Sequence, residues 1–194
     1  MWQDLLAKFT HIGDTKLLVL CGLGVCLYLW GSEERRSLAQ SWAMAFGFCV
    51  LLTILGKLAL HAVRWNEGTS LRLLSPSGHV AIGTCFYGCC AIMLSAGRNR
   101  TVRLVAWVGT VALLSALAAS RLELGLHSVP EIIIAFAIGA ASLVVFTRRL
   151  NAGPPVRLNA GHMISLILLL FVAYYMPPVD GEALIIQVVR TLTL

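Results

Sequence analysis

Two histidines and three basic side chains stand near the ends of strongly apolar segments, within three short polar stretches. Charged groups are costly at the edge of a bilayer unless a function uses them. Imidazoles exchange protons near neutral pH, and basic side chains bind phosphate oxygens. The combination indicates phosphate chemistry at a membrane surface. The five residues are Lys57, Arg64, His79, Arg121 and His127.

The first stretch carries Lys57 and Arg64, which lie seven residues apart and share one helix face with His61. Lys57 stands about two turns inside an apolar run, so its ammonium either reaches back to the interface or binds an anion. Two cations that merely anchor a helix end would give the same pattern. A phosphate-binding role for this pair therefore needs support from the other two stretches.

The second stretch is Pro76-Ser77-Gly78-His79, directly before an apolar run. It favours a tight turn whose free backbone N–H groups point out of a helix N-terminus, where anions bind. Gly78 lets the backbone approach a ligand closely. An ordinary turn with Ser77 as the helix cap is an equal alternative, because a four-residue match arises easily by chance.

The third stretch runs from Ser120 and Arg121 to His127 and Glu131. Arg121 offers a planar guanidinium that suits phosphate oxygens. Glu131 follows His127 by four residues, so on a helix its carboxylate can reach the imidazole and fix its tautomer. Ser128 and Glu131 also fit a capping box. Both interpretations stay open here, since one carboxylate cannot fully serve two partners.

The composition places these stretches in a membrane protein. Of 194 residues, 58% are hydrophobic and 12% are charged, which is too apolar for a soluble domain. In such a protein the net charge of +6 reflects topology, so we expect no nucleic-acid partner. Six cysteines lie in apolar runs without zinc-type spacing, which indicates packing. No cleaved secretory signal is expected, since Asp4 precedes the first lysine and no cleavage pattern follows.

The elements that would position the polar stretches are apolar runs of near-spanning length, which need about 20 residues each. They predict an all-α fold, an integral membrane bundle of about six transmembrane helices. We interpret residues 1–194 as one membrane-embedded domain: 1–15 an amphipathic interfacial helix, 16–177 the bundle and 178–194 a C-terminal tail. The runs are Lys16–Trp30, Leu38–Arg64, His79–Ala96, Leu104–Ser120, His127–Phe146 and Met163–Met176.

The connections between these runs alternate between two faces, and one face is rich in arginine. By the positive-inside rule that face is cytoplasmic. The three polar stretches and both termini then open on the opposite side, which is the periplasm in a bacterium. We therefore expect a multi-pass protein of the bacterial inner membrane with a periplasmic site. The arginines of the first face are Arg35, Arg36, Arg98, Arg100, Arg103, Arg148, Arg149 and Arg157.

Taken together, the stretches resemble the motifs of the type 2 phosphatidic acid phosphatase family of integral membrane lipid phosphatases. The family pattern is Lys, six residues, Arg-Pro; then Pro-Ser-Gly-His; then Ser-Arg, five residues, His, three residues, Asp. Two positions depart from it: Trp65 replaces the proline, and Glu131 replaces the aspartate. We expect an altered loop and a slightly shifted geometry. The matching residues are Lys57, Arg64, Pro76, Ser77, Gly78, His79, Ser120, Arg121 and His127.

The resemblance implies a metal-independent hydrolase that works through a phosphohistidine. His127 would attack phosphorus, Glu131 would orient it, and His79 would protonate the leaving oxygen and later activate water. Basic side chains and N–H groups would hold the phosphate oxygens in place of a metal ion, so no cofactor is expected. The implied phosphate-binding residues are Lys57, Arg64, Ser77, Gly78 and Arg121. Arg72 either contacts a lipid head group or is a solvated charge.

The expected partners are the bilayer and a lipid whose phosphate stands at the membrane surface. The periplasmic side favours undecaprenyl diphosphate, cleaved to undecaprenyl phosphate. Phosphatidic acid, phosphatidylglycerol phosphate and the phosphates of lipid A are alternative substrates. A lipid phosphotransferase and a non-catalytic transporter or scaffold are alternative classes. Transporters place polar groups near the bilayer midplane, whereas these charges stand toward helix ends, which favours an enzyme.

Overall fold

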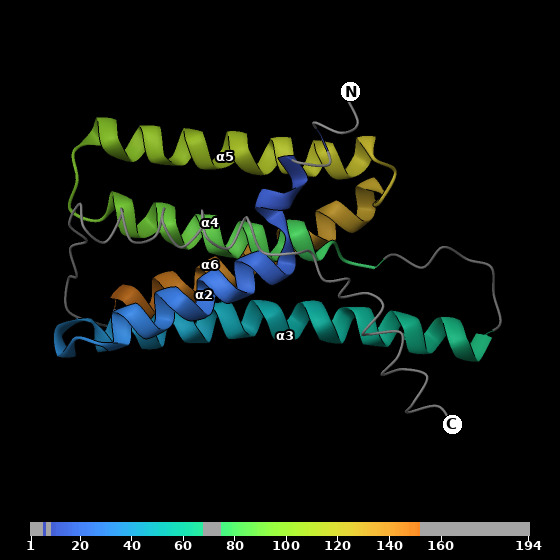
Figure 1. The fold of residues 1–194 in the computed structure, drawn as a ribbon, viewed down its shortest axis with the longest axis horizontal. Coiled ribbons are helices and arrows are strands. Elements are labelled where there is room, and N and C mark those ends of the chain that lie inside the picture. Colours follow the sequence, from blue (N-terminus) through green and yellow to red (C-terminus); the bar gives the residue numbers. More distant parts are fainter. Residues whose placement is uncertain (1–5, 7–8, 68–74, 152–194) are drawn as a thin grey trace.

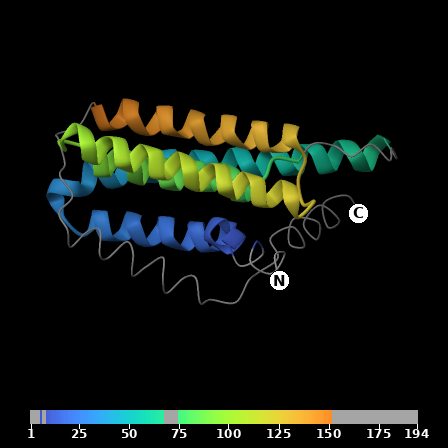
Figure 2. The same ribbon diagram turned by 90° about the horizontal axis from the view of Figure 1, so that it is seen from above.

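The described chain is a bundle of α-helices (Figures 1 and 2). The computed structural model describes Leu6, residues 9–67 and residues 75–151. No strand occurs within these residues, which confirms the predicted all-α fold. The elements are η1 (His11–Gly13), α2 (Thr15–Trp30), η2 (Glu33–Arg35), α3 (Arg36–Glu67), α4 (Gly78–Ser95), α5 (Arg100–Glu123) and α6 (Val129–Asn151).

Helices α3, α4, α5 and α6 are long and apolar enough to cross a membrane, and α2 is a shorter apolar helix of 16 residues. Consecutive helices run in opposite directions, so their ends gather at two opposite ends of the bundle (Figure 1). The chain is therefore a multi-pass membrane protein. The predicted run Met163–Met176, the tail 178–194, and residues 1–5 and 7–8 of the predicted interfacial helix lie outside the described residues.

The observed helices extend beyond most of the predicted apolar runs. Helix α3 continues to Glu67, and α5 begins at Arg100 and ends at Glu123. An apolar run marks the part of a helix that matches the hydrocarbon thickness of the bilayer. The backbone hydrogen bonds of the helix continue beyond it into the polar interface. The run His127–Phe146 begins before its helix: α6 extends from Val129 to Asn151, so His127 lies in the turn before α6 rather than on a helix.

Helix α4 lies at the centre and packs against α2, α3, α5 and α6. An aromatic cluster fixes these neighbours: the ring of Trp42 on α3 lies edge-on to Phe86 of α4 and Phe146 of α6, at centroid distances of 5.5 and 6.3 Å. The indole N–H of Trp42 also donates to the carbonyl oxygen of Gly22 on α2, at 2.9 Å. These contacts hold four helices together in the half of the bundle remote from the polar stretches.

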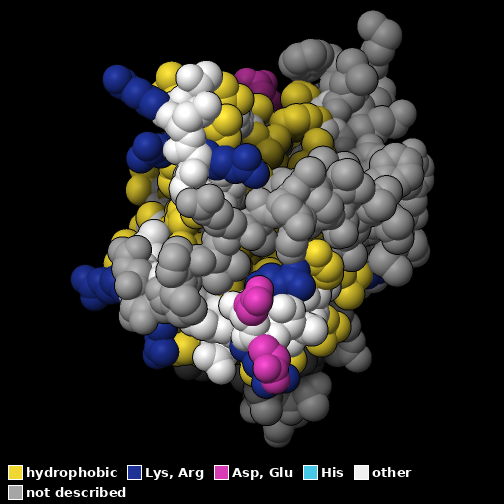
Figure 3. Space-filling view, turned by 90° about the vertical axis from the view of Figure 1, so that its left-hand side faces the viewer, with side chains coloured by type: hydrophobic (Ala, Val, Ile, Leu, Met, Phe, Trp, Pro, Cys, Tyr) yellow, Lys and Arg dark blue, Asp and Glu magenta, His cyan; other side chains and the backbone are white. Residues whose placement is uncertain are grey.

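The two ends of the bundle differ in their charged groups. One end is ringed by basic side chains, and it faces the viewer in Figure 3. Its exposed arginines are Arg36, Arg98, Arg100, Arg103, Arg148 and Arg149. The other end gathers the N-termini of α2, α4 and α6 with the C-termini of α3 and α5, and it carries the three polar stretches.

Candidate active site

The turn that leads into α4 is held by three other helices. The backbone N–H of Ser75 donates to Glu131 Oε1 on α6, at 2.8 Å. A Cβ added at Gly78 would lie 2.8 Å from Thr15 Oγ1 on α2, and one added at Gly56 of α3 would lie 3.1 Å from the proline ring of the turn. Small residues therefore let α2 and α3 approach this turn closely. His79 follows in the first turn of α4 and is thereby fixed in place.

The turn between α5 and α6 places His127 beside the end of α5. Gly125 adopts a φ of +64°, the left-handed conformation that commonly ends a helix. The N–H groups of Leu126 and His127 then both donate to the carbonyl oxygen of Arg121, at 3.1 and 3.3 Å. The segment from Arg121 to His127 is thus one compact unit, which brings a guanidinium and an imidazole to the same end of the bundle.

Glu131 joins the two histidine-bearing turns. Its Oε2 lies 3.3 Å from His127 Nδ1 and accepts hydrogen bonds from the Ser128 N–H at 2.7 Å and the Ser128 hydroxyl at 3.1 Å. Its Oε1 accepts the bond from Ser75 in the turn before α4. The two interpretations of Glu131 that the sequence leaves open therefore coexist, because one oxygen caps α6 and also contacts the imidazole.

The imidazole of His127 is buried against Glu131. Only 7% of its side chain is exposed. Burial lowers the pKa of His127 below its ordinary value of 6.5; Glu131 opposes this shift, and the charges of Arg121 and Lys57 reinforce it. The ring is therefore neutral at neutral pH. A carboxylate at Nδ1 favours the proton on that nitrogen, which leaves the lone pair of Nε2 free.

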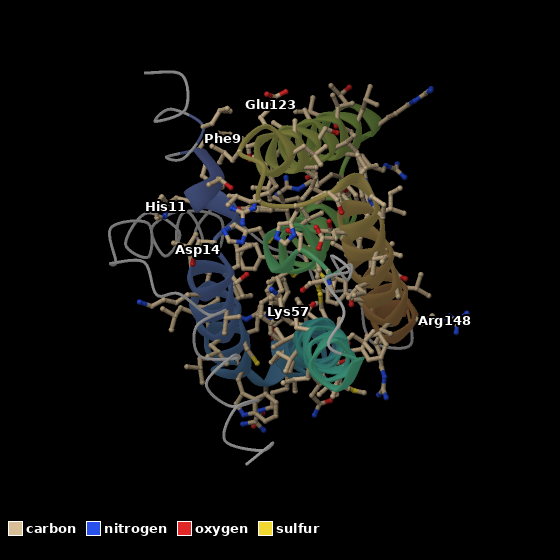
Figure 4. All side chains as sticks on the ribbon, turned by 90° about the vertical axis from the view of Figure 1, so that its right-hand side faces the viewer. Phe9, His11, Asp14, Lys57, Glu123 and Arg148 are labelled. Carbon is tan, nitrogen blue, oxygen red and sulfur yellow. The ribbon has the colours of Figure 1, made fainter. Side chains whose placement is uncertain are left out.

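His79, Lys57 and Arg121 lie close to His127 at the same end of the bundle. The imidazole of His79 interacts electrostatically with Arg121, His127 and Lys57. Lys57 is 8% exposed, and Figure 4 shows it between the helices rather than at the periphery. One guanidinium nitrogen of Arg121 donates to Thr10 Oγ1 at 3.4 Å. The arrangement places two fixed cations and two imidazoles close together, and such a set of groups is chemically suited to an anion.

The other predicted site residues divide into two groups. Ser77 and Gly78 are buried at the start of α4, and the Ser77 hydroxyl has no hydrogen-bond partner in the described part of the chain. Arg64 and Arg72 lie outside the residues whose side chains the structure describes. The structure thus brings together His79, His127, Glu131, Lys57, Arg121, Ser77 and Gly78 at one end of the bundle.

Sequence reasoning missed Asp14, whose Oδ2 lies 3.9 Å from His79 Nε2. The residue could have been recognised as a helix cap, because an aspartate stands directly before the apolar run of α2. Its proximity to His79 is a tertiary contact between residues far apart in the chain, and no local pattern reports it. The same holds for Thr10 and its bond to Arg121.

Comparison with known proteins assigns this constellation to a family. The family model described as PAP2 superfamily matches residues 43–153, which include all three polar stretches and more than half of the chain. An uncharacterized 22.5 kDa protein in the cps region of Klebsiella pneumoniae is 28% identical over 146 residues, 75% of this chain and 67% of that protein. No solved structure matches the chain significantly. The chain therefore belongs to the PAP2 superfamily, whose members are phosphatases.

Proposed function

We propose that this protein is a metal-independent lipid phosphatase that forms a phosphohistidine at His127, with undecaprenyl diphosphate as its substrate. The observation that carries the proposal is the buried pair of His127 and Glu131, which lies beside His79, Lys57 and Arg121 at one end of a membrane bundle. Family membership gives the reaction class, and the geometry suggests which residue does what.

In the first step the Nε2 lone pair of His127 attacks phosphorus, and the bond between phosphorus and the leaving oxygen breaks. His79 donates a proton to that oxygen. Glu131 holds Nδ1–H and stabilises the positive charge that develops on the ring of His127. The product of this step is a phosphorylated His127 and the released lipid.

In the second step water attacks phosphorus while His79 accepts its proton, and the bond between phosphorus and Nε2 breaks. Inorganic phosphate leaves, and both histidines return to their starting states. Lys57 and Arg121 lie where they can balance the charge on the non-bridging oxygens. The buried Ser77 hydroxyl and the N–H groups at the start of α4 offer further contacts to those oxygens. We expect this set to replace the metal ion that many phosphatases use.

The position of the site supports a lipid substrate. The candidate residues stand at one end of a set of apolar spans, so we expect them at the level of a lipid phosphate. The exposed arginines ring the opposite end, which the positive-inside rule makes cytoplasmic. The site then opens to the periplasm, the face on which undecaprenyl diphosphate is released. Phosphatidic acid, phosphatidylglycerol phosphate and lipid A phosphates fit the same chemistry.

The test is phosphate release by detergent-purified protein in the presence of EDTA. Undecaprenyl diphosphate, phosphatidic acid, phosphatidylglycerol phosphate and lipid A are compared for the wild type and for His127→Ala, with Arg148→Ala as a control from the opposite end. We expect His127→Ala to lose at least about a thousandfold in rate, since it removes the nucleophile, and Arg148→Ala to keep full activity. Radiolabelled phosphate should remain on wild-type protein that is quenched in base.

Four outcomes would contradict parts of the proposal. Full activity in His127→Ala would refute the phosphohistidine. Loss of activity in EDTA, restored by a divalent cation, would refute metal independence. Label that appears in a lipid acceptor rather than as free phosphate would identify a phosphotransferase. Absence of turnover with all four lipids would favour a non-catalytic role.

A further inference from the structure

The N-terminal segment from Thr10 to Thr15 lies against the candidate site, although it precedes the residues 43–153 that the family model matches. Thr10 accepts the hydrogen bond from Arg121, and the hydroxyl of Tyr87 on α4 donates to the carbonyl oxygen of Ile12, at 2.7 Å. The segment is thus tied to α4 and α5 at the end that carries both histidines.

Within this segment the two carboxylate oxygens of Asp14 have different surroundings. Oδ1 accepts from the N–H groups of Lys16 and Leu17, at 2.9 and 3.1 Å, and so caps α2. Oδ2 lies 3.9 Å from His79 Nε2. The cap fixes the side chain of Asp14, so its second oxygen is held toward the imidazole without a separate entropic cost. Figure 4 shows Asp14 where η1 joins α2.

The charges around His79 explain why a carboxylate matters there. The groups that interact electrostatically with its ring include Arg121 of α5, Lys57 of α3, His127 of the α5–α6 turn and His11 of η1, and each is a cation or becomes one on protonation. Asp14 supplies the opposite charge. At 3.9 Å its Oδ2 is beyond hydrogen-bond distance, so it acts on the ring through its charge and leaves the N–H proton available for transfer.

We propose that Asp14 is a positioning residue that holds the ring of His79 and stabilises its protonated form until the leaving oxygen takes the proton. This inference rests on the proposed phosphatase function. The site then contains two carboxylate–imidazole pairs: Glu131 serves the histidine that attacks, and Asp14 serves the histidine that donates the proton. The second carboxylate comes from a part of the chain outside the matched family region.

The two roles of Asp14 can be separated by substitution. Asparagine is as good a helix cap as aspartate, so Asp14→Asn keeps the bonds of Oδ1 and removes only the charge. Asp14→Ala removes the cap bonds and the charge together. We expect Asp14→Asn to retain the thermal stability of the wild type while kcat/KM falls about tenfold, a part of the whole contribution of a general acid. Asp14→Ala should lose both stability and activity. Glu123→Gln removes an exposed carboxylate that points away from the bundle and is the matched control (Figure 4).

A pH profile and a double-mutant cycle provide readouts that capping alone would not change. The loss in Asp14→Asn should be greatest at alkaline pH and should shrink as the pH falls, because added protons restore the imidazolium. Against p-nitrophenyl phosphate, whose leaving group needs no proton, His79→Gln should keep measurable activity. In that background Asp14→Asn should cause no further loss, since its effect passes through His79.

The outcomes separate this inference from the function on which it rests. An active wild type with an unchanged Asp14→Asn variant would overturn the role of Asp14 alone. A loss that is equal at every pH, or that persists in the His79→Gln background, would also overturn it. A wild type that hydrolyses none of the phosphate esters would overturn the phosphatase, and the role of Asp14 with it.

Discussion

The two ends of the bundle carry the same kinds of charged side chain in opposite settings. Helix α5 makes the contrast within one element: Arg103 near its start is exposed, whereas Arg121 near its end is half-buried and bonded to Thr10. The exposed arginines lie on the surface of one end, but Lys57 at the other end is buried between helices. Exposed cations suffice to set the orientation in the membrane, while buried cations are costly enough to indicate chemistry.

Beyond the loss expected for His127→Ala, the largest effect should come from one substitution made at both ends of α5. Arg121→Lys keeps the charge but loses the planar fork that matches phosphate oxygens, so we expect kcat/KM to fall about a hundredfold. Arg103→Lys makes the same change at the exposed end and should leave kcat/KM unchanged. The kcat/KM of each variant is measured on the lipid that the wild type hydrolyses most efficiently. Equal losses in the two variants would abolish the distinction between the ends.

A smaller effect should appear in the pH dependence of Glu131→Gln. The lowered pKa of His127 predicts that the wild type stays active below pH 6.5, because the nucleophile is neutral above its own pKa. Glu131 raises that pKa, so its neutral replacement should move the acid limb of kcat/KM to still lower pH while the rate falls about tenfold. Glutamine also fits a capping box, which keeps the start of α6 intact.

The substrate is the same for both proteins, so its own ionisation cannot produce a difference between the two pH profiles. A shift of the acid limb to higher pH in Glu131→Gln would contradict the electrostatic role of Glu131. An unchanged limb with normal turnover would reduce Glu131 to a helix cap.

The smallest effect should come from a cap at the arginine-rich end. Asn99 Oδ1 accepts the N–H of Val102 at 2.9 Å, as Asp14 does for α2 at the other end, but no histidine lies beside it in the described contacts. We expect Asn99→Ala to lower the free energy of unfolding by about 1 kcal/mol and to leave kcat/KM unchanged. Thermal unfolding in detergent checks the expected loss of stability, and phosphate release checks the unchanged kcat/KM. A loss of activity at constant stability would contradict the division between the ends.

The sequence predicts the class of fold and the position of the polar stretches, because apolar length and motif spacing are local properties. Local pattern also suggests the capping box of Ser128 and Glu131. It does not show that the other oxygen of Glu131 reaches Ser75, since that bond joins residues far apart in the chain. The partnership of Asp14 and His79 is hidden for the same reason. The observed helix ends differ from the ends of the predicted apolar runs, because hydropathy reports the hydrocarbon layer and not the backbone hydrogen bonds.

The central position of α4 has a consequence for how the protein is made. Of the four long helices, α4 is the most enclosed by the others. A helix that is enclosed on most sides is positioned by its contacts with neighbouring helices rather than by lipid. Helices α5 and α6 emerge later in synthesis and supply much of that enclosure. His79 therefore reaches its place only when the whole bundle has been inserted, so an incompletely synthesised chain would not assemble the candidate site.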